Sequence, residues 1–158
     1  MSIADCRFET VKRLAIAAFP AVLVALAIAA PFLADAPWVA ISIRRFFSYV
    51  CHQDPARSFW LAGAPVAVCV RCLGIYMGAA AGALLPARRE VVLRMFVAAV
   101  AMNLVDIGAE WAGWHGNLPA LRFALGMIAG LVAGALVVSS LRDSEGSKRA
   151  APTASAVG

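Results

Sequence analysis

The stretch VAVCVRCLGIYMGAAAGALL (residues 66–85) decides how this chain can fold. Arg71 is its one charged residue, and about 20 helical residues of this kind cross the roughly 30 Å hydrocarbon core of a bilayer. Three further stretches are similarly long and apolar, at about residues 14–33, 91–111 and 118–141. The sequence therefore predicts an all-α integral membrane bundle of four transmembrane helices, contained within residues 1–141.

The composition of the whole chain agrees with a lipid environment. Of its 158 residues, 63% are hydrophobic and 15% are charged, and the mean hydropathy is +0.83. A soluble domain is about one half apolar and one quarter charged. Period-two alternation, the mark of a membrane β-barrel, does not occur. The lipid bilayer is therefore the partner that composition predicts.

The basic residues indicate how the chain is oriented. If both termini are cytoplasmic, nine Lys and Arg residues lie on the cytoplasmic side and five lie on the other. Cytoplasmic segments of membrane proteins carry the excess of basic residues. We therefore expect a multi-pass protein of the inner (plasma) membrane with both termini in the cytoplasm. Orientation and lipid contact account for the net charge of +5, and no nucleic-acid partner is expected.

Two polar segments flank the predicted helices. Residues 34–65 form an external segment, in which residues 38–50 are too short and too charged to span but suit an amphipathic helix in the headgroup layer, or a cap on the bundle. Residues 142–158 are small and polar, which predicts a disordered cytoplasmic tail. The helix at 14–33 resembles a signal peptide, but its apolar run exceeds the about 7 to 15 residues usual for one.

Glycine recurs at every fourth position in two of the predicted helices. The two stripes are Gly74, Gly78 and Gly82, and Gly126, Gly130 and Gly134. Small residues at this spacing let two helix backbones approach closely in a membrane. The stripes join helices either within one chain or between chains, so a homo-oligomer or a membrane partner at these positions stays open.

Polar side chains gather at the external end of the bundle. Helical spacing places Cys69, Cys72 and Tyr76 on one face of the helix at 66–85. It likewise aligns Asn103, Asp106 and Glu110 on the helix at 91–111. Arg71 and Asp106 lie at similar depths, so we expect an ion pair between them, because an unpaired charge in hydrocarbon is costly. The remaining residues expected to support the site are Gln53, Arg57 and Arg122.

Three thiols and an imidazole at this end provide the ligand count of a four-coordinate zinc site. Cys69 and Cys72 form a C-x2-C half-site, whereas Cys51 and His52 are adjacent and seldom aim at one ion. Asp106 or a water can replace either of these two. The predicted ligands for zinc or another thiophilic metal are therefore Cys51, His52, Cys69, Cys72 and Asp106.

Two other hypotheses use the same thiols. In the first, Cys69 and Cys72 form a redox pair with Cys51 as the exchanging third thiol, similar in outline to four-helix membrane oxidoreductases that pass electrons from protein thiols to a quinone. In the second, one disulfide is a structural staple, which an odd number of external cysteines makes less natural. The sequence leaves open whether the site is catalytic.

The motif CHQDPARSFW followed by PVAVCVRCLGIYMG resembles an uncharacterised family of small predicted membrane proteins from bacteria and archaea. Its pattern has the form C-H-Q-x-P-x-R-S-F, then C-x-R-C-x-G-x-Y-x-G, then a D-G-x-x-Q helix end, where this chain has Asp106, and an R-x-x-x-G helix. The chain departs from it at Ile107 and Glu110 and has an extra residue between Pro65 and Cys69. The resemblance implies the fold and the position of the site, and no activity.

Overall fold

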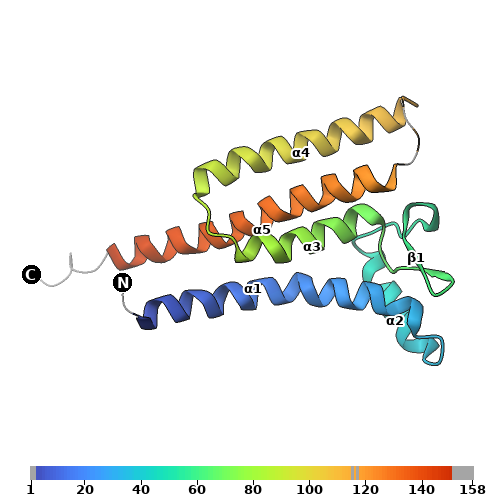
Figure 1. The fold of residues 1–158 in the computed structure, drawn as a ribbon, viewed down its shortest axis with the longest axis horizontal. Coiled ribbons are helices and arrows are strands. Elements are labelled where there is room, and N and C mark those ends of the chain that lie inside the picture. The colour runs from blue at the N-terminus through green and yellow to red at the C-terminus, as the bar shows by residue number, and fades with distance from the viewer. Residues whose placement is uncertain (1–2, 115, 117, 151–158) are drawn as a thin grey trace, which may run out of the picture.

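The computed structural model describes residues 3–114, 116 and 118–150, and this part of the chain is almost entirely helical (Figure 1). The long helices are α1 (Ile3–Ala29), α3 (Val70–Leu84), α4 (Arg89–Trp111) and α5 (Pro119–Ala150), and a 3-10 turn, η1 (Ala30–Phe32), extends α1. Three stretches are long and apolar enough to cross a membrane: Glu9–Phe32, Arg89–Trp111 and Pro119–Ser144. The predicted all-α membrane bundle is confirmed.

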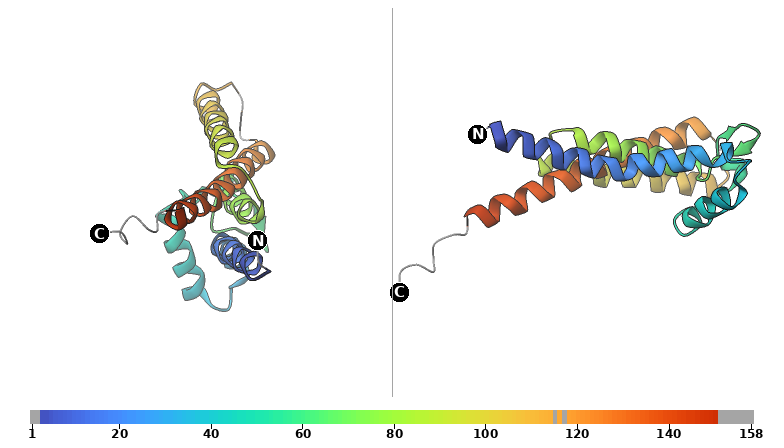
Figure 2. Two further views of the ribbon diagram at one scale, coloured as in Figure 1. Left: turned by 90° about the vertical axis from the view of Figure 1, so that its left-hand side faces the viewer. Right: turned by 90° about the horizontal axis from the view of Figure 1, so that it is seen from below.

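The four long helices lie side by side in the order α1, α3, α5, α4. The helix α3 contacts α1 on one side and α5 on the other, and α4 packs against the far side of α5. The end-on view in Figure 2 shows the same succession. The bundle is therefore an open row in which α3 and α5 are the inner members.

The short elements gather at one end of the row, opposite the beginning of α1 and the end of α5 (Figure 1). They are α2 (Pro37–Ser48), a 3-10 turn η2 (Pro55–Arg57), and the antiparallel strands β1 (Trp60–Leu61) and β2 (Ala64–Pro65). On α2, Trp38 and Ile41 are exposed and Phe47 is fully buried. This is the amphipathic helix that residues 38–50 predict.

The helix predicted at 66–85 begins at Val70, four residues later than expected. Other segments hold the preceding backbone: the Val66 N–H donates to Phe59 O at 2.9 Å, and the Ala67 N–H donates to Ala27 O at 3.1 Å. With 15 residues, α3 is about 22 Å long, shorter than the other three. Non-helical backbone next to the membrane-spanning helices is tolerated because Val66, Ala67 and Val68 are buried in protein.

The two outer ends of the chain are more helical than expected. Helix α1 begins at Ile3 and carries Pro20 in its interior. Helix α5 continues through Ala150, beyond residue 141 where the predicted transmembrane helix ends. The next proline after Pro119 comes only at position 152, and short polar residues without proline do not end a helix already formed. Residues 151–158 lie outside the described part.

The two glycine stripes face each other between α3 and α5. A Cβ at Gly78 would meet the backbone of Met127, and a Cβ at Gly82 would meet the backbone of Leu131. In the opposite direction, a Cβ at Gly130 would meet the backbone of Ile75. The stripes therefore join two helices of the same chain, which is one of the arrangements the sequence left open.

We expect Gly78→Ala to destabilise the protein, although alanine normally favours a helix. The new methyl group would have to separate α3 from α5, and overpacking of this kind costs about 1 to 3 kcal/mol. Gly108→Ala on α4 is the matched control, because nothing lies within 4 Å of a Cβ there. Thermal unfolding in detergent should show a lower midpoint for Gly78→Ala alone, and equal midpoints would contradict the close approach.

Candidate metal centre

Cys51 is placed by the end of α2. Its N–H donates to Phe47 O at 2.9 Å, which continues the last helical turn by one residue. Phe47 is fully buried and Cys51 is 6% exposed, so the end of α2 is anchored in the apolar core. Two residues later, Gln53 has a φ of 52°, in the left-handed region, and the chain turns back over the thiol.

Gln53 connects the turn to the segments on either side. Its Nε2 donates to Arg44 O on α2 and to Ala67 O before α3, both at 2.7 Å. Its backbone N–H lies 3.4 Å from Cys51 Sγ and donates to it. The hydrogen bonds of this one residue thus connect α2, the thiol of Cys51 and the segment that precedes α3.

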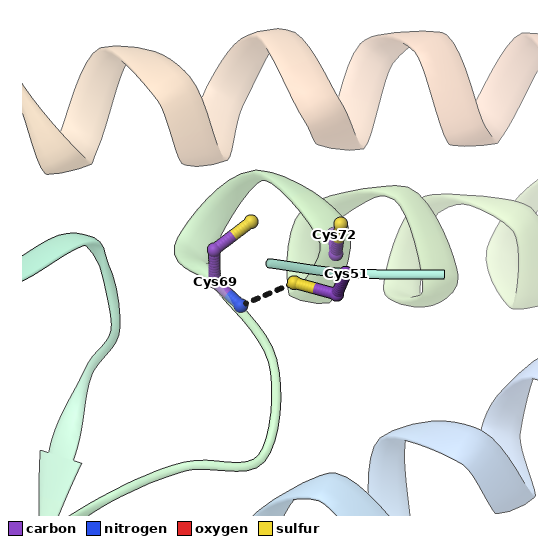
Figure 3. Close-up of side chains that lie close together, drawn as sticks. All are labelled: Cys51, Cys69 and Cys72. Carbon is purple, nitrogen blue, oxygen red and sulfur yellow. Dashed lines mark hydrogen bonds between the residues drawn. The ribbon is translucent and has the colours of Figure 1, made fainter. Parts of the chain in front are cut away.

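Cys69 and Cys72 come from the start of α3. Cys69 is the N-cap residue, with φ −68° and ψ 160°, and Cys72 lies one turn further on the same face. The Cys69 N–H donates to Cys51 Sγ at 3.2 Å, the bond drawn in Figure 3. All three cysteines are free, and their Sγ atoms lie within 4.8 Å of one another. Thiols from two segments, 18 residues apart, are therefore brought together.

The surroundings of Cys51 favour its thiolate. Hydrogen bonds from the Cys69 and Cys72 thiols hold the pKa of Cys51 well below its usual range, and the backbone N–H groups of Cys69 and Gln53 lower it further. Burial acts in the opposite direction and is outweighed. A thiolate is the form in which cysteine binds a metal or attacks a disulfide.

The walls around the thiols are apolar. Cys51 belongs to a buried cluster with Phe47, Val68 and Leu73, and Cys69, Cys72, Tyr76 and Phe123 pack against that cluster. The ring of Tyr76 lies 6.2 Å, centroid to centroid, from that of Phe47. The sulfurs are therefore the main electron-pair donors in their immediate surroundings.

Two of the five predicted metal ligands do not join the thiols. His52 is exposed at the surface of the turn, and in the described part of the chain the group able to hold an ion contains Cys51, Cys69 and Cys72 alone. The side chain of His52 leaves the site because adjacent residues on a turn diverge. Asp106 is buried in an ion pair with Arg71, which removes it from the ligand set.

Two carboxylates near the end of α4 form ion pairs with three arginines that lie at the same end of the bundle as the thiols. The predicted Arg71–Asp106 pair joins α3 to α4, and Arg71 Nη2 donates to Asp106 Oδ2. Glu110 binds two arginines: Arg122 on α5, which is 3% exposed, and Arg57 at 3.0 Å. These ion pairs connect three segments to a helix whose backbone packs mainly against α5.

Asn103 fulfils a structural role in the same stripe. Its Nδ2 donates to Ala99 O at 3.0 Å and to Leu125 O at 3.2 Å, which adds a hydrogen bond between α4 and α5. The predicted polar stripe of α4 is therefore an interface. His115, expected in the turn after α4, lies outside the described residues.

The sequence did not single out two residues that shape the site. Arg44 donates from Nη2 to Pro65 O at 2.6 Å and so fixes the strand before α3 to α2. Asp54 accepts the Ala56 N–H at 2.9 Å and pairs with Arg57 at 3.3 Å. The Asp54-Pro55 pair is a turn signal that could have indicated Asp54, whereas no local pattern indicates Arg44.

This fold and this site define a small α-helical membrane protein with a three-cysteine cluster at one end of its helices. Residues 51–136, which contain the cluster and its arginines, match the family described as "Predicted membrane protein (DUF2085)", and the chain belongs to that family. The family resemblance seen in the sequence is therefore confirmed.

Two curated archaeal proteins are similar to the chain. "Uncharacterized protein MJ1492" of Methanocaldococcus jannaschii is 33% identical over 105 residues, which cover 59% of this chain and 64% of that protein. An "Uncharacterized protein" of Methanothermobacter thermautotrophicus is 33% identical over 92 residues, covering 54% of this chain and 81% of that protein. The chain thus spans a little under two thirds of the first relative. No solved structure matches it.

We expect Asp106→Asn to destabilise the protein by about 3 kcal/mol or more, because it leaves the charge of Arg71 opposed by a neutral amide. The exposed Glu90→Gln, at the other end of α4, is the control. Replacing both partners, as Arg71→Met with Asp106→Leu, should recover most of the loss. Denaturant unfolding in micelles measures all three, and a loss no larger than that of the control would contradict a strong pair.

Proposed function

We propose that this protein binds one thiophilic metal ion, of the zinc type, through Cys51, Cys69 and Cys72. The observation that carries the proposal is the convergence of the three Sγ atoms within 4.8 Å. An ion at the centre of three sulfurs no more than 4.8 Å apart is at most about 2.8 Å from each, against about 2.3 Å for a Zn–S bond. The sulfurs therefore need to move inward by about half an ångström at most to bind the ion.

The environment of the sulfurs supports metal binding more than a structural disulfide. The sulfur of Cys51 accepts hydrogen bonds from two backbone N–H groups, and such donors stabilise metal-bound sulfur. All three cysteines are free, so no disulfide consumes a ligand. The number of thiols also fits one ion better than one disulfide, which would leave a third thiol over.

We propose that the site faces away from the cytoplasm. The described ends of α1 and α5 lie together at the end of the row opposite the cluster, as two cytoplasmic termini require (Figure 1). Of the five arginines at the site end, Arg57, Arg71 and Arg122 are ion-paired with carboxylates of α4. Nine of the fourteen Lys and Arg residues lie toward the end with the termini and five lie toward the thiols, which favours the first end for the cytoplasm of the plasma membrane.

The second candidate function is thiol–disulfide exchange by Cys69 and Cys72. It is favoured by one observation, that these two thiols are half-buried whereas the neighbouring thiol of Cys51 is buried. Electron transfer onward to a quinone stays a prediction from the sequence. A metal and a disulfide exclude each other at these sulfurs, so one experiment separates the two functions.

The protein purified anaerobically in detergent should contain about one zinc-type ion per chain. Each of Cys51→Ser, Cys69→Ser and Cys72→Ser should weaken metal binding by about ten-fold or more, because each removes a ligand. Cys6→Ser, on α1, is the matched control and should bind like the parent. Elemental analysis and thiol alkylation before and after chelation provide the measurement.

The two candidate functions predict different thiol counts in that experiment. In a metal site, the three thiols become reactive after chelation without any reductant. If the protein carries no metal, and its thiols appear only after reduction, metal binding is wrong and thiol–disulfide exchange is favoured.

The orientation has its own test. In intact cells treated with a chelator, a membrane-impermeant maleimide should label the cluster and leave Cys6 unlabelled, and detergent should then expose Cys6. Single-cysteine variants identify which thiol reacts. Labelling of Cys6 without the cluster would place the site in the cytoplasm and contradict the proposed topology.

A further inference from the structure

The three sulfurs leave one position of a four-coordinate ion without a protein ligand. Zinc-type ions are bound by four ligands in closed structural sites, whereas sites that exchange a ligand keep one position open. In the described part of the chain, the groups able to supply a fourth ligand are committed elsewhere: His52 is exposed outside the cluster, and Asp106 pairs with Arg71.

The burial of the three cysteines indicates from which side a fourth ligand reaches the ion. Cys51 is 6% exposed and lies against Phe47 and Val68, so the ion is closed in by protein behind that sulfur. Cys69 and Cys72 are only half-buried, at the first turn of α3 (Figure 3). A fourth ligand therefore approaches across Cys69 and Cys72.

The chemistry of the three ligands selects the kind of fourth ligand. Three thiolates carry a charge of −3, which exceeds that of a divalent ion and makes the bound ion electron-rich and soft. Such an ion polarises a bound water weakly, so it is poorly suited to generate hydroxide for hydrolysis. Soft sulfur donors suit it better, and the rings of Phe47 and Phe123, which pack in the same cluster, offer no hydrogen bond to a bound water.

We infer that the centre is an open three-thiolate site whose fourth ligand is the thiolate of another molecule, so that the metal is passed on or received by ligand exchange. This rests on the proposed function. In the exchange, an external thiol R–SH binds the ion in place of a solvent ligand, and its proton is released to solvent. No electron is transferred, and Cys69 or Cys72 can then dissociate, while Cys51 is the last ligand to leave.

The test uses the full-length reduced protein in detergent, loaded with Co²⁺ as a coloured substitute for zinc. Addition of 2-mercaptoethanol should raise the sulfur-to-cobalt charge-transfer absorption saturably by about one third, as three Co–S bonds become four. Ethylene glycol, in which oxygen replaces the sulfur, is the matched control and should leave the absorption unchanged. His52→Ala should give the same spectrum as the parent before thiol is added.

The outcomes separate this inference from the proposed function. One outcome is that cobalt binds but 2-mercaptoethanol does not raise the charge-transfer absorption, or removes the cobalt without first raising it. The open thiolate-accepting position is then wrong and metal binding stands. A changed starting spectrum in His52→Ala would show a fourth protein ligand and also overturn the inference. If neither cobalt nor zinc binds the reduced protein, the proposed function itself fails.

Discussion

The structure depends on how the backbone between β2 and α3 satisfies its hydrogen bonds. In lipid, polar backbone groups outside a helix must find partners within the protein. Here the partners are Phe59 O, Ala27 O, the amide of Gln53 and the sulfur of Cys51. These bonds delay the start of α3 until Val70. The sulfur of Cys51 is thus a backbone acceptor and a candidate ligand at once, so the fold and the site share an atom.

The same arrangement explains where the charges lie. The glycine contact brings α3 and α5 together, and α4 packs mainly against α5. Asp106 and Glu110 then attach the outer half of α4 to arginines of α3, α5 and η2. The polar residues predicted to form one functional cluster therefore divide into a group of thiols with apolar neighbours and an adjacent network of ion pairs. The first is suited to chemistry, and the second holds the helices around it.

The sequence predicted the class of fold, the site end of the bundle and the three thiols, because hydropathy, glycine spacing and C-x2-C are local signals. It predicted the pairing of Arg71 with Asp106 because helical depth and the cost of an isolated charge act together. It could not exclude His52, since the direction of a side chain depends on the turn at Gln53. It also missed the role of Arg44, whose bond to Pro65 O joins segments 21 residues apart, and the helix over 142–150.

The position of the cluster along α1 fixes its depth in the membrane. Ala67 bonds to Ala27, and Ala27 and Ala30 share the core that contains Cys51. The apolar span of α1 continues to Phe32, about 7 Å beyond Ala27. The thiols thus lie level with the apolar span of α1 and not beyond its end. Under the proposed function, an ion that reaches them gives up most of its hydration shell, and a donor molecule has to extend its sulfur past the end of the bundle.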